Sequence, residues 1–578
     1  MKKIIKSLSR ASLLWVILYF TVMTVVMTWP LVTRMGDSMV GLVGDNIYFV
    51  WMIGWFKKAL FDLGVNPFNI WFLNYPEGWS LAYTEITQAN LAIAMPFYFI
   101  GGEVFAYNMA MIFTFVLSGL GMYLWVRQLS GRWDAALLAG TVYAFIPYHF
   151  AHFRIGHLNL SGMQWFPFYF MGLWDLLKRQ DWSWKPVLLG GIALGLIANT
   201  SQYYFYMTAL VSVFLVVIYL LKERERLKDW AFWKRLLAMG LVALPLVVFA
   251  VFPYVSLLNE GGLTDRNMGI VRKYSASPLD FLLPSTDHFL WGEWVWRNFN
   301  RDLWIEATLY VGAVSGVLAV LAWLKRKELK QEGLLRLMLW GTLFSIILAM
   351  GTDLHWNENP VELALPAGLA ARLGRESLPL VLPGYFLFLY FPMYAKLRAL
   401  MRFGVFALVF VSTAAGLGSA WLLEKLPEKR RLAVWVLLLV LVFVDLYPGA
   451  YQDFSQVEPR PADAWLAAQP GDGAWAQFPF ELQEDQEHIY GQLINGKPFL
   501  GGFFNAFPPR QYREIMPVME TFPSAESVAL LKSLDMTYVL VNRTYYDDIE
   551  DLRRACEELG LVLLAEAGDD LIYGFGSR

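Results

Sequence analysis

Two stretches near the N-terminus decide the fold of this chain. The first is an uncharged apolar run, Ala11-Ser-Leu-Leu-Trp-Val-Ile-Leu-Tyr-Phe-Thr-Val-Met-Thr-Val-Val-Met-Thr-Trp-Pro-Leu-Val-Thr33, and the second, a short way further on, is Gly41-Leu-Val-Gly-Asp-Asn-Ile-Tyr48. The first run is long enough to cross a bilayer. Asp45 is then a carboxylate held at the membrane surface in apolar surroundings, which is costly to desolvate and usually has a task. That placement makes Asp45 a candidate catalytic base.

The composition indicates a polytopic membrane protein. Of the 578 residues, 57% are hydrophobic and 17% are charged, whereas a soluble domain carries more charge. The net charge of -2 gives no support for a nucleic-acid partner. Cys556 is the single cysteine, so an intramolecular disulfide is excluded and a cysteine-based metal site is not expected. The 16% of aromatic residues suits interfacial belts and a cavity that takes sugar or lipid.

The basic residues predict the topology. Lys and Arg precede the first run, which is too long for a secretory h-region and lacks a small-residue cleavage site, so we predict a retained span with a cytoplasmic N-terminus. Later basic clusters, such as Lys222 to Arg235, become cytoplasmic turns by the positive-inside rule. The further predicted spans are Val104–Val126, Trp133–Phe150, Leu160–Leu177, Pro186–Asn199, Tyr203–Leu221, Leu236–Val255, Ala307–Leu324, Leu335–Met350, Met401–Leu423 and Leu432–Tyr447.

The predicted fold class is therefore an all-α polytopic membrane domain of about 11 transmembrane helices, over residues 1–448. The segment Asn90–Ile100 is too short to span the membrane and contains Pro96. The count of about 11 therefore requires this segment to lie at the interface or to re-enter the membrane. The long segments 35–103, 257–306 and 351–400 then all face outside. Large loops on one face only, opposite short basic turns, suggest an active surface on the outer side.

The composition changes near Gly449, and we predict a small extracytoplasmic α/β domain at 449–578. Alternation predicts buried strands, and helical periodicity predicts two amphipathic helices. The glycine-containing segment Asn495–Gly502 is expected to be a loop between strand and helix, and it lacks the features of a phosphate-binding P-loop. The predicted elements are strands Ala474–Phe480, Thr537–Val541, Leu561–Glu566 and Asp570–Gly574 and helices Ala525–Leu534 and Ile549–Leu559.

Asp45 has two compatible interpretations. The apolar, aromatic segment Asn46–Phe61 is predicted to be a helix in the membrane interface with Asp45 at its N-cap. A carboxylate there is also kept ionised by the helix N-terminus. Capping and catalysis therefore both remain open from the residues alone.

The order of these motifs resembles the GT-C superfamily of integral-membrane glycosyltransferases. More narrowly, the chain looks like bacterial multi-span proteins implicated in glycosylating cell-wall polymers. No single motif is specific, but their order is, and it covers most of the membrane region. The stretches that carry the resemblance are Gly44-Asp-Asn-Ile-Tyr-Phe-Val-Trp51, Asn66-Pro-Phe68, Tyr75-Pro-Glu-Gly78, Ala106-Tyr-Asn108, Gly156-His-Leu158, Glu306-Ala-Thr-Leu-Tyr-Val-Gly312 and Arg398 with Met401-Arg-Phe403.

The resemblance implies inverting transfer of a hexosyl or pentosyl group from a polyprenyl-phosphate donor to an acceptor hydroxyl. Asp45 matches the first-loop Asp that is thought to act as base. The expected partners are this donor, a glycan, lipid or protein acceptor and membrane lipids, on the outer face of the bacterial cytoplasmic (inner) membrane. Members often carry a second acid in the second outer loop, whereas Tyr148–Leu160 has none. Glu77 and Glu85 of the first loop are candidates for that second carboxylate.

Cations that could hold a leaving phosphate lie in the predicted outer loops. His149, His152, Arg154 and His157 cluster in the second loop and suit phosphate or sugar contact, a metal, or a solvated loop end. Arg398 and Arg402 break the positive-inside bias, which favours phosphate binding over snorkelling. The candidate substrate-binding residues are Glu85, His152, Arg154, His157, Arg272, Lys273, His288, Arg398 and Arg402.

Several alternatives stay open. Arg272 and Lys273 suit interfacial anchoring as well as a phosphate clamp, and His288 suits a turn. No residue is assigned to a metal and no cofactor is required, although a divalent cation remains an alternative. The competing functions are a transporter or lipid flippase and a non-catalytic envelope-assembly protein. A transporter should show related halves and polar residues near the bilayer midplane. The sequence shows no related halves, and most of the predicted spans carry no ionisable residue.

Overall fold

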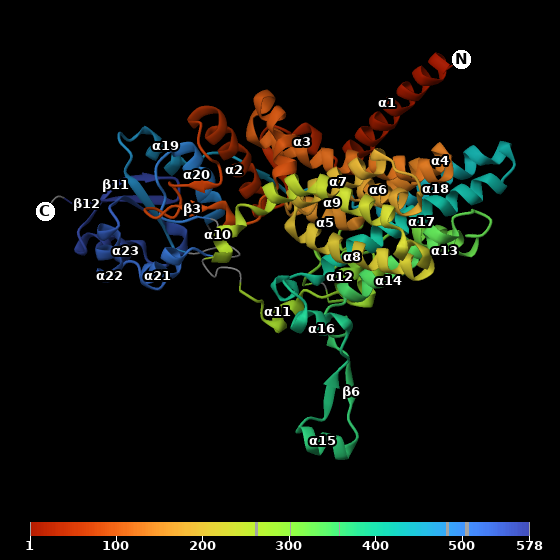
Figure 1. Ribbon diagram of the computed structural model, residues 1–578. Coiled ribbons are helices and arrows are strands. Elements are labelled where there is room, and N and C mark those ends of the chain that lie inside the picture. The colour runs from red at the N-terminus through yellow and green to blue at the C-terminus, as the bar shows by residue number, and fades with distance from the viewer. Residues whose placement is uncertain are drawn as a thin grey trace.

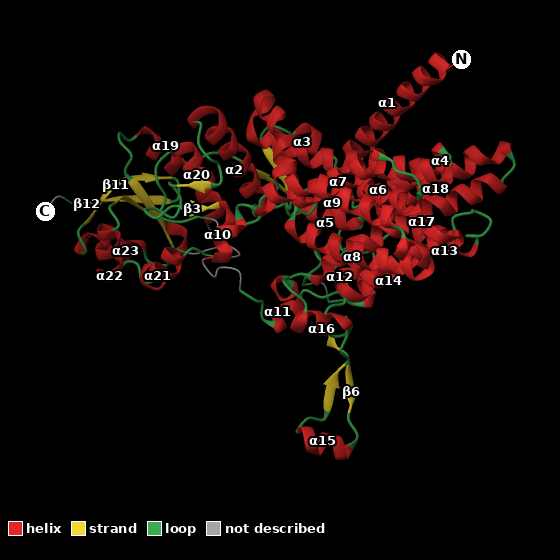
Figure 2. Ribbon diagram, viewed as in Figure 1, coloured by secondary structure: helices red, strands yellow, loops and turns green. Residues whose placement is uncertain are grey.

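The computed structural model is mainly helical and describes residues 2–259, 264–300, 302–357, 359–480, 485–502 and 508–576. Most of its helices gather in one bundle (Figure 1). The strands and helices of the C-terminal part lie together at one end, and a hairpin arm projects away from the rest (Figures 1 and 2). Residues 260–263, 301 and 358 of the predicted outer loops lie outside the described residues.

The N-terminal part contains a long segment between the first helix and the third, which includes most of the predicted outer loop 35–103. Within the third helix, φ/ψ angles are non-helical at Gly101 and Gly102, where Gly102 has φ +78°, so two helical segments meet there. The predicted interfacial segment Asn90–Ile100 and the predicted span Val104–Val126 fall on either side of this break. The elements are α1 (Lys2–Met27), β1 (Ser38–Val40), α2 (Asp45–Lys57), a π-helical turn (Lys58–Leu63), β2 (Asn69–Ile70), β3 (Trp79–Ser80) and α3 (Gln88–Ser130).

The bundle is closely packed through small residues. A Cβ on Gly172 of α6 would lie 2.6 Å from the backbone nitrogen of Gly190 on α7, and one on Gly418 of α17 would lie 1.9 Å from the Leu318 carbonyl of α13. Small residues allow such close approach of helix backbones in a membrane. The bundle helices are α4 (Trp133–Ala144), α5 (Pro147–Arg154), α6 (Phe166–Lys178), α7 (Trp184–Thr200), α8 (Gln202–Lys222), α9 (Trp230–Val251), α13 (Ala313–Leu324), α14 (Glu332–Ala349), α17 (Gly404–Lys425) and α18 (Glu428–Leu446).

One predicted span is wrong: Trp133–Phe150 is not a single helix. It is split into α4 and α5, and Ile146 between them is extended, with ψ 145°. The cause is Pro147, which disfavours helical geometry in the preceding residue and suits the first turn of a new helix.

Five helices of the described chain are long and apolar enough to cross a membrane. On α9, large apolar side chains three or four residues apart, such as Leu237, Leu241 and Leu244, are exposed on one face and suited to lipid. These helices indicate a membrane protein, while eleven crossings stay a prediction. The five are Gln88–Ser130, Gln202–Lys222, Trp230–Val251, Glu332–Ala349 and Leu400–Lys425, and the shorter apolar helices are Leu13–Met27 and Ala313–Leu324.

The C-terminal part contains a four-stranded sheet of order β11-β12-β10-β9, in which only the β9–β10 pair is parallel. Every residue of β9 is buried. The four predicted strands and two predicted helices coincide with elements found here, whereas the segment 496–502 follows the helix α20 rather than a strand. The elements are β9 (Ala474–Phe478), β10 (Met536–Asn542), β11 (Leu561–Ala567), β12 (Asp570–Phe575), α19 (Pro461–Ala468), α20 (Asp485–Asn495), α21 (Arg510–Met519), α22 (Ala525–Ser533) and α23 (Ile549–Glu558).

This C-terminal part is bound to the first outer segment. Strand β8 (Phe454–Gln456) pairs antiparallel with β1. The backbone N–H of Tyr75 donates to the Phe499 carbonyl at 3.1 Å, and that of Phe499 donates to the Phe72 carbonyl at 2.8 Å. Segments distant in sequence therefore hold the loop that carries Asp45.

The remaining outer elements are short. The projecting arm in Figure 1 consists of β6, α15 and β7. These elements are α10 (Tyr254–Asn259), α11 (Met268–Lys273), α12 (Gly292–Asn298), β4 (His355–Trp356), β5 (Asn359–Pro360), β6 (Glu362–Ala364), α15 (Ala367–Leu373), β7 (Ser377–Pro379) and α16 (Pro383–Tyr390).

Candidate active site

Asp45 is the first residue of α2, and the N-cap is Gly44. The prediction that Asp45 itself caps the helix is wrong by one position. The reason is Asn46, whose Oδ1 accepts hydrogen bonds from the backbone N–H groups of Gly44 and Ile47, at 2.9 Å each. The Asp45 carboxylate instead approaches His157, with 2.8 Å between Oδ2 and Nε2.

A small polar cavity of about 80 Å³ opens beside Asp45. Its walls come from separate parts of the chain, including α2, the segments before α3 and after α5, the start of α8 and the segment before α17. Three arginines and two carboxylates line it, so it can take a negatively charged group. The lining residues are Asp45, Tyr48, Phe49, Thr84, Glu85, His157, Asn159, Leu160, Tyr203, Arg266, Arg398 and Arg402.

Two histidines form a hydrogen-bonded pair behind Asp45. The Nδ1 atoms of His157 and His152 are 2.8 Å apart, and Nε2 of His152 is 4.0 Å from a Glu306 oxygen. One of the two Nδ1 atoms must donate. The ionised Asp45 carboxylate can only accept, so Nε2 of His157 donates the proton that joins these two side chains.

The charge of Arg402 is fixed by a buried carboxylate. Its Nη2 and Nε donate to Glu306 Oε1 at 2.6 and 3.0 Å, and both side chains are less than 10% exposed. Burial alone would raise the pKa of Glu306, but the charge of Arg402, helped by His152 and His157, lowers that pKa to about 2. Another nitrogen of Arg402, Nη1, lies 3.9 Å from Glu85. The Arg402 guanidinium thus lies in the cavity wall and is paired with the Glu306 carboxylate behind that wall.

The surroundings keep Asp45 ionised. Burial alone would raise the pKa of its carboxyl, but the hydrogen bond from His157 and the charges of His157, Arg398 and Arg402 outweigh burial and lower that pKa. The side chain remains 31% exposed. At neutral pH the cavity therefore presents an anionic oxygen that can accept a proton.

A larger apolar cavity of about 330 Å³ adjoins the polar one. The two share Thr84, Glu85, Tyr203 and Arg266 as lining residues. Beyond these, its wall is mainly apolar and aromatic, and it includes Phe205, Tyr206, Val251, Tyr254, Met393 and Leu397. A charged group and an apolar chain of one amphiphilic ligand could lie in neighbouring spaces.

Of the ten predicted site residues, five line the polar cavity and one touches a residue that does. The five are Asp45, Glu85, His157, Arg398 and Arg402, and His152 is bonded to His157. Four others lie elsewhere in the described chain. They are Arg154, Arg272, Lys273 and His288.

These four side chains lie outside both cavities, and three of them have clear local partners. Arg154 forms ion pairs with Asp287 and Asp453. Arg272 bonds Asp353 at 2.7 Å. His288 is buried, with Nε2 at 3.0 Å from the Val444 carbonyl, and its Nδ1 accepts from two backbone N–H groups in a turn. Lys273 ends α11.

The polar cavity also contains residues that sequence reasoning did not select. These residues include Arg266, Tyr203 and Asn159. Asn159 donates a hydrogen bond to Glu85. Arg266 is placed through its backbone N–H, which donates to the Ala395 carbonyl at 2.8 Å. No periodicity or spacing could have indicated that contact.

The described residues contain no group of three or more His, Cys, Asp or Glu side chains arranged to hold a metal ion. Nearby, His149 is stacked on Phe115, with 3.7 Å between ring centres, and bonded to Thr114. A role for a divalent cation remains a prediction.

No family model matches the chain, and no curated protein matches its sequence. Solved structures do match. The arabinofuranosyltransferase AftD from Mycobacteria is 13% identical, with a TM-score of 0.58 over 98% of this chain. The match spans only 40% of AftD.

The archaeal oligosaccharyltransferase AglB from Archaeoglobus fulgidus, solved with an inhibitory peptide and a dolichol-phosphate, is also 13% identical. Its TM-score is 0.50, over 99% of this chain and 74% of that chain. The apo form of the Archaeoglobus fulgidus oligosaccharyltransferase gives a TM-score of 0.51 at 13% identity, over 98% of this chain and 74% of that chain. At such low identity the likeness concerns the fold alone, and the chain shares the fold of these solved membrane proteins.

Proposed function

We propose that this chain is an inverting membrane glycosyltransferase. It moves a sugar from a polyprenyl-phosphate donor to an acceptor hydroxyl on the outer face of the cytoplasmic membrane. The observation that carries this proposal is Asp45, an ionised carboxylate in a cavity that it shares with three arginines. The fold it shares with AftD and AglB, which are named as sugar transferases, supports the reaction class by analogy.

The residues have complementary roles in one displacement. Asp45 takes the proton of the acceptor hydroxyl, whose oxygen bonds to the anomeric carbon of the donor sugar. The bond from that carbon to the phosphate oxygen breaks, and the phosphate leaves with the electron pair from the opposite face, so the configuration inverts. General-base assistance of this kind contributes about 10²–10⁴ in rate.

The arginines of the cavity stabilise the leaving phosphate. Charge develops on its oxygens in the transition state, and donors placed beforehand lower the barrier most effectively. Arg402 is held by Glu306, so its position does not depend on the substrate. Arg266 and Arg398 supply further positive charge on the same wall.

The adjoining apolar cavity suits the isoprenoid chain of the donor. Tyr203 and Arg266 line both cavities, which places them where the phosphate would join the chain. The amphiphilic nature of the donor thus matches two spaces that meet, one charged and one apolar.

The topology follows the same proposal. The membrane domain comprises residues 1–448 with about 11 crossings and outer loops 35–103, 257–306 and 351–400. The part at 449–578 is an extracytoplasmic α/β domain. Its contacts with the first outer segment support this side of the membrane, because β8 pairs with β1 shortly before Asp45. It acts as a cap or acceptor-binding module.

The test compares wild type with Asp45→Asn. Purified protein is incubated with radiolabelled polyprenyl-phosphate sugars and envelope extract, and transfer to the extract is measured. The matched control is Asp62→Asn, which removes an exposed carboxylate of the same loop that pairs only with Lys57 among the described residues. Transfer lost in Asp45→Asn alone supports the proposal. Equal transfer in all three proteins removes Asp45 from it, and lipid translocation without transfer would point to a flippase.

A further inference from the structure

A second, larger cavity lies at the opposite end of the bundle from Asp45. It has a volume of about 660 Å³ and lies between the ends of α6 and α8 and the start of α14. Tyr203 in the first turn of α8 lines the polar cavity, and Lys222 in its last turn lines this one. A helix of 21 residues is about 30 Å long, which is the thickness of a bilayer core. We call this space the basal cleft.

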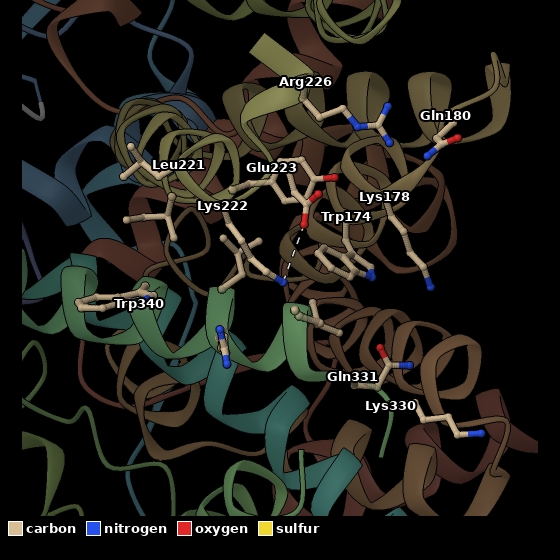
Figure 3. A pocket seen from close by; sticks show the side chains of 16 residues that line it. Trp174, Lys178, Gln180, Leu221, Lys222, Glu223, Arg226, Lys330, Gln331 and Trp340 are labelled. Carbon is tan, nitrogen blue, oxygen red and sulfur yellow. Dashed lines mark ion pairs between the residues drawn. The ribbon is translucent and has the colours of Figure 1, made fainter. Parts of the chain in front are cut away.

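The rim of the basal cleft is cationic. Lys178, Lys222, Arg226, Lys330 and Arg336 line it, against the single carboxylate of Glu223. Figure 3 shows the Lys222 ammonium directed toward the Glu223 carboxylate, and the two groups are 3.8 Å apart. Lys178 and Lys330 lie to the right of this pair in the view of Figure 3.

Only some of these charges are neutralised. Arg226 pairs with Asp229 at 3.0 Å, and Arg336 pairs with Glu332 at 2.5 Å. Lys178 and Lys330 have no ion pair within the described part of the chain. The cleft therefore has a surplus of positive charge carried mainly by lysine ammonium groups.

The wall next to this rim is apolar. This wall includes Leu334, Leu337 and Trp340 of α14 and Ile218 and Leu221 of α8. Trp340 is 51% exposed, and Trp174 forms another part of the wall. A soluble anion would use only the lysines, whereas an amphiphile would use both the lysines and this wall.

We propose that the basal cleft binds one anionic phospholipid of the adjacent leaflet. Its phosphate lies among Lys178, Lys222 and Lys330, and its acyl chains follow the apolar wall of α8 and α14. Charge complementarity favours this occupant, since basic pockets between membrane helices recognise anionic headgroups and tryptophan favours the interface. The site lies about a bilayer's thickness from Asp45, so it is separate from the proposed reaction.

The test measures lipid binding to the delipidated, full-length protein in detergent. Native mass spectrometry compares phosphatidylglycerol with phosphatidylcholine of the same acyl chains, and a further arm adds inorganic phosphate as competitor. We expect selective retention of phosphatidylglycerol. The triple variant Lys178→Gln/Lys222→Gln/Lys330→Gln should weaken that binding about tenfold or more, and phosphate alone should compete poorly.

The matched control is Lys185→Gln/Lys429→Gln/Arg430→Gln. It removes the same charge from exposed basic residues of other turns that do not line the cleft, and its lipid binding should stay within about twofold of wild type. An equal loss of phosphatidylglycerol binding in the control variant would mean that the lipid is attracted by the general positive charge of this face rather than by a defined site. Equal binding of phosphatidylcholine would exclude headgroup recognition, and efficient competition by phosphate would identify a soluble-anion site instead.

Loss of folding in the cleft variant is checked separately. Melting temperature and gel-filtration profile are compared for all three proteins. If the cleft variant has a lower melting temperature, the proposal is tested on the wild-type protein instead. Raising the salt concentration should release phosphatidylglycerol from it and leave the residual binding of phosphatidylcholine unchanged. Salt-independent binding would contradict the proposal.

Discussion

The two charged regions of this molecule, the polar cavity around Asp45 and the basal cleft, use their charges in opposite ways. In the polar cavity Arg402 is 4% exposed and is locked to Glu306 by hydrogen bonds. In the basal cleft the Lys222 side chain is 56% exposed and lies 3.8 Å from Glu223. The first region fixes its charge in a defined, buried position, and the second leaves its charge exposed to solvent.

This difference predicts how each region responds to substitution. A buried charge left without its partner is strongly destabilising, typically by about 3–5 kcal/mol. An exposed pair contributes about 0–1 kcal/mol and is screened by salt. Precise positions suit chemistry on a developing charge, whereas solvated positions suit attraction of a charged headgroup.

The largest expected effect is on transfer by Asp45→Asn. The amide cannot take the acceptor proton, so the transfer rate should fall by about 10²–10⁴. Melting temperature should change little, because Asp45 is partly exposed and does not cap its helix. Initial transfer rates and thermal melts of the same preparation test both statements. A variant that loses its fold along with its activity would contradict them.

Glu306→Gln contrasts the two regions most directly. It leaves Arg402 buried without its anion, and we expect the free energy of unfolding to fall by about 3–5 kcal/mol. The matched change in the basal cleft is Glu223→Gln, whose carboxylate is 48% exposed; there we expect less than about 1 kcal/mol. Denaturant unfolding in detergent measures both, and similar losses would mean that the contrast is false.

Acid should act through the same pair. Glu306 has its pKa lowered from 4.5 to about 2 in the folded protein, so the pair stabilises the fold fully above pH 4.5 and the contribution is lost as the pH falls toward 2. Unfolding measured across this window should show stability declining with acid. Glu306→Gln should make that decline shallower, and an identical slope in both proteins would exclude Glu306 as its source.

The smallest effect is expected for His157→Gln. Its imidazole acts through Asp45 as a positioning group, so we expect a loss of about tenfold in transfer rate, the size of one hydrogen bond to a charged group. The acid limb of the pH–rate profile should move to higher pH, because His157 helps to hold the Asp45 pKa low. His355→Gln, at an outer histidine that does not line the cavity, is the control. An unshifted acid limb in His157→Gln would count against the hydrogen bond.

The sequence predicted best those site residues whose position follows from the membrane topology alone. Asp45, His157 and Arg402 lie beside different predicted spans, on the same predicted face, and the structure brings all three to one cavity. Pro147 breaks the predicted span Trp133–Phe150 into two helices, although the apolar run as a whole is long enough to suggest one span. The N-cap prediction failed because Asn46 competes locally for the same backbone donors.

Contacts between distant loops were beyond prediction. Glu306 and Arg402 are 96 residues apart, and their pairing depends on how α13 and α17 pack. Arg266 reaches the cavity because its backbone bonds residue 395. Among the candidates that lie elsewhere, Arg154 and Arg272 carry the same charge as Arg402. Their own acidic partners, which are remote in sequence, distinguish them from it.

The strand pair β1–β8 has a consequence for the biosynthesis of the protein. The Ser455 hydroxyl bonds the Gly41 carbonyl, 414 positions earlier in the chain. At roughly 5–20 residues per second, a ribosome needs about 20–80 s to make the intervening chain. During that time the helices enter the membrane one after another, while the segment leading to Asp45 waits without its partner strand. If the chain is the transferase proposed above, a chain that stops after α18 lacks β8 and should insert into the membrane but remain inactive.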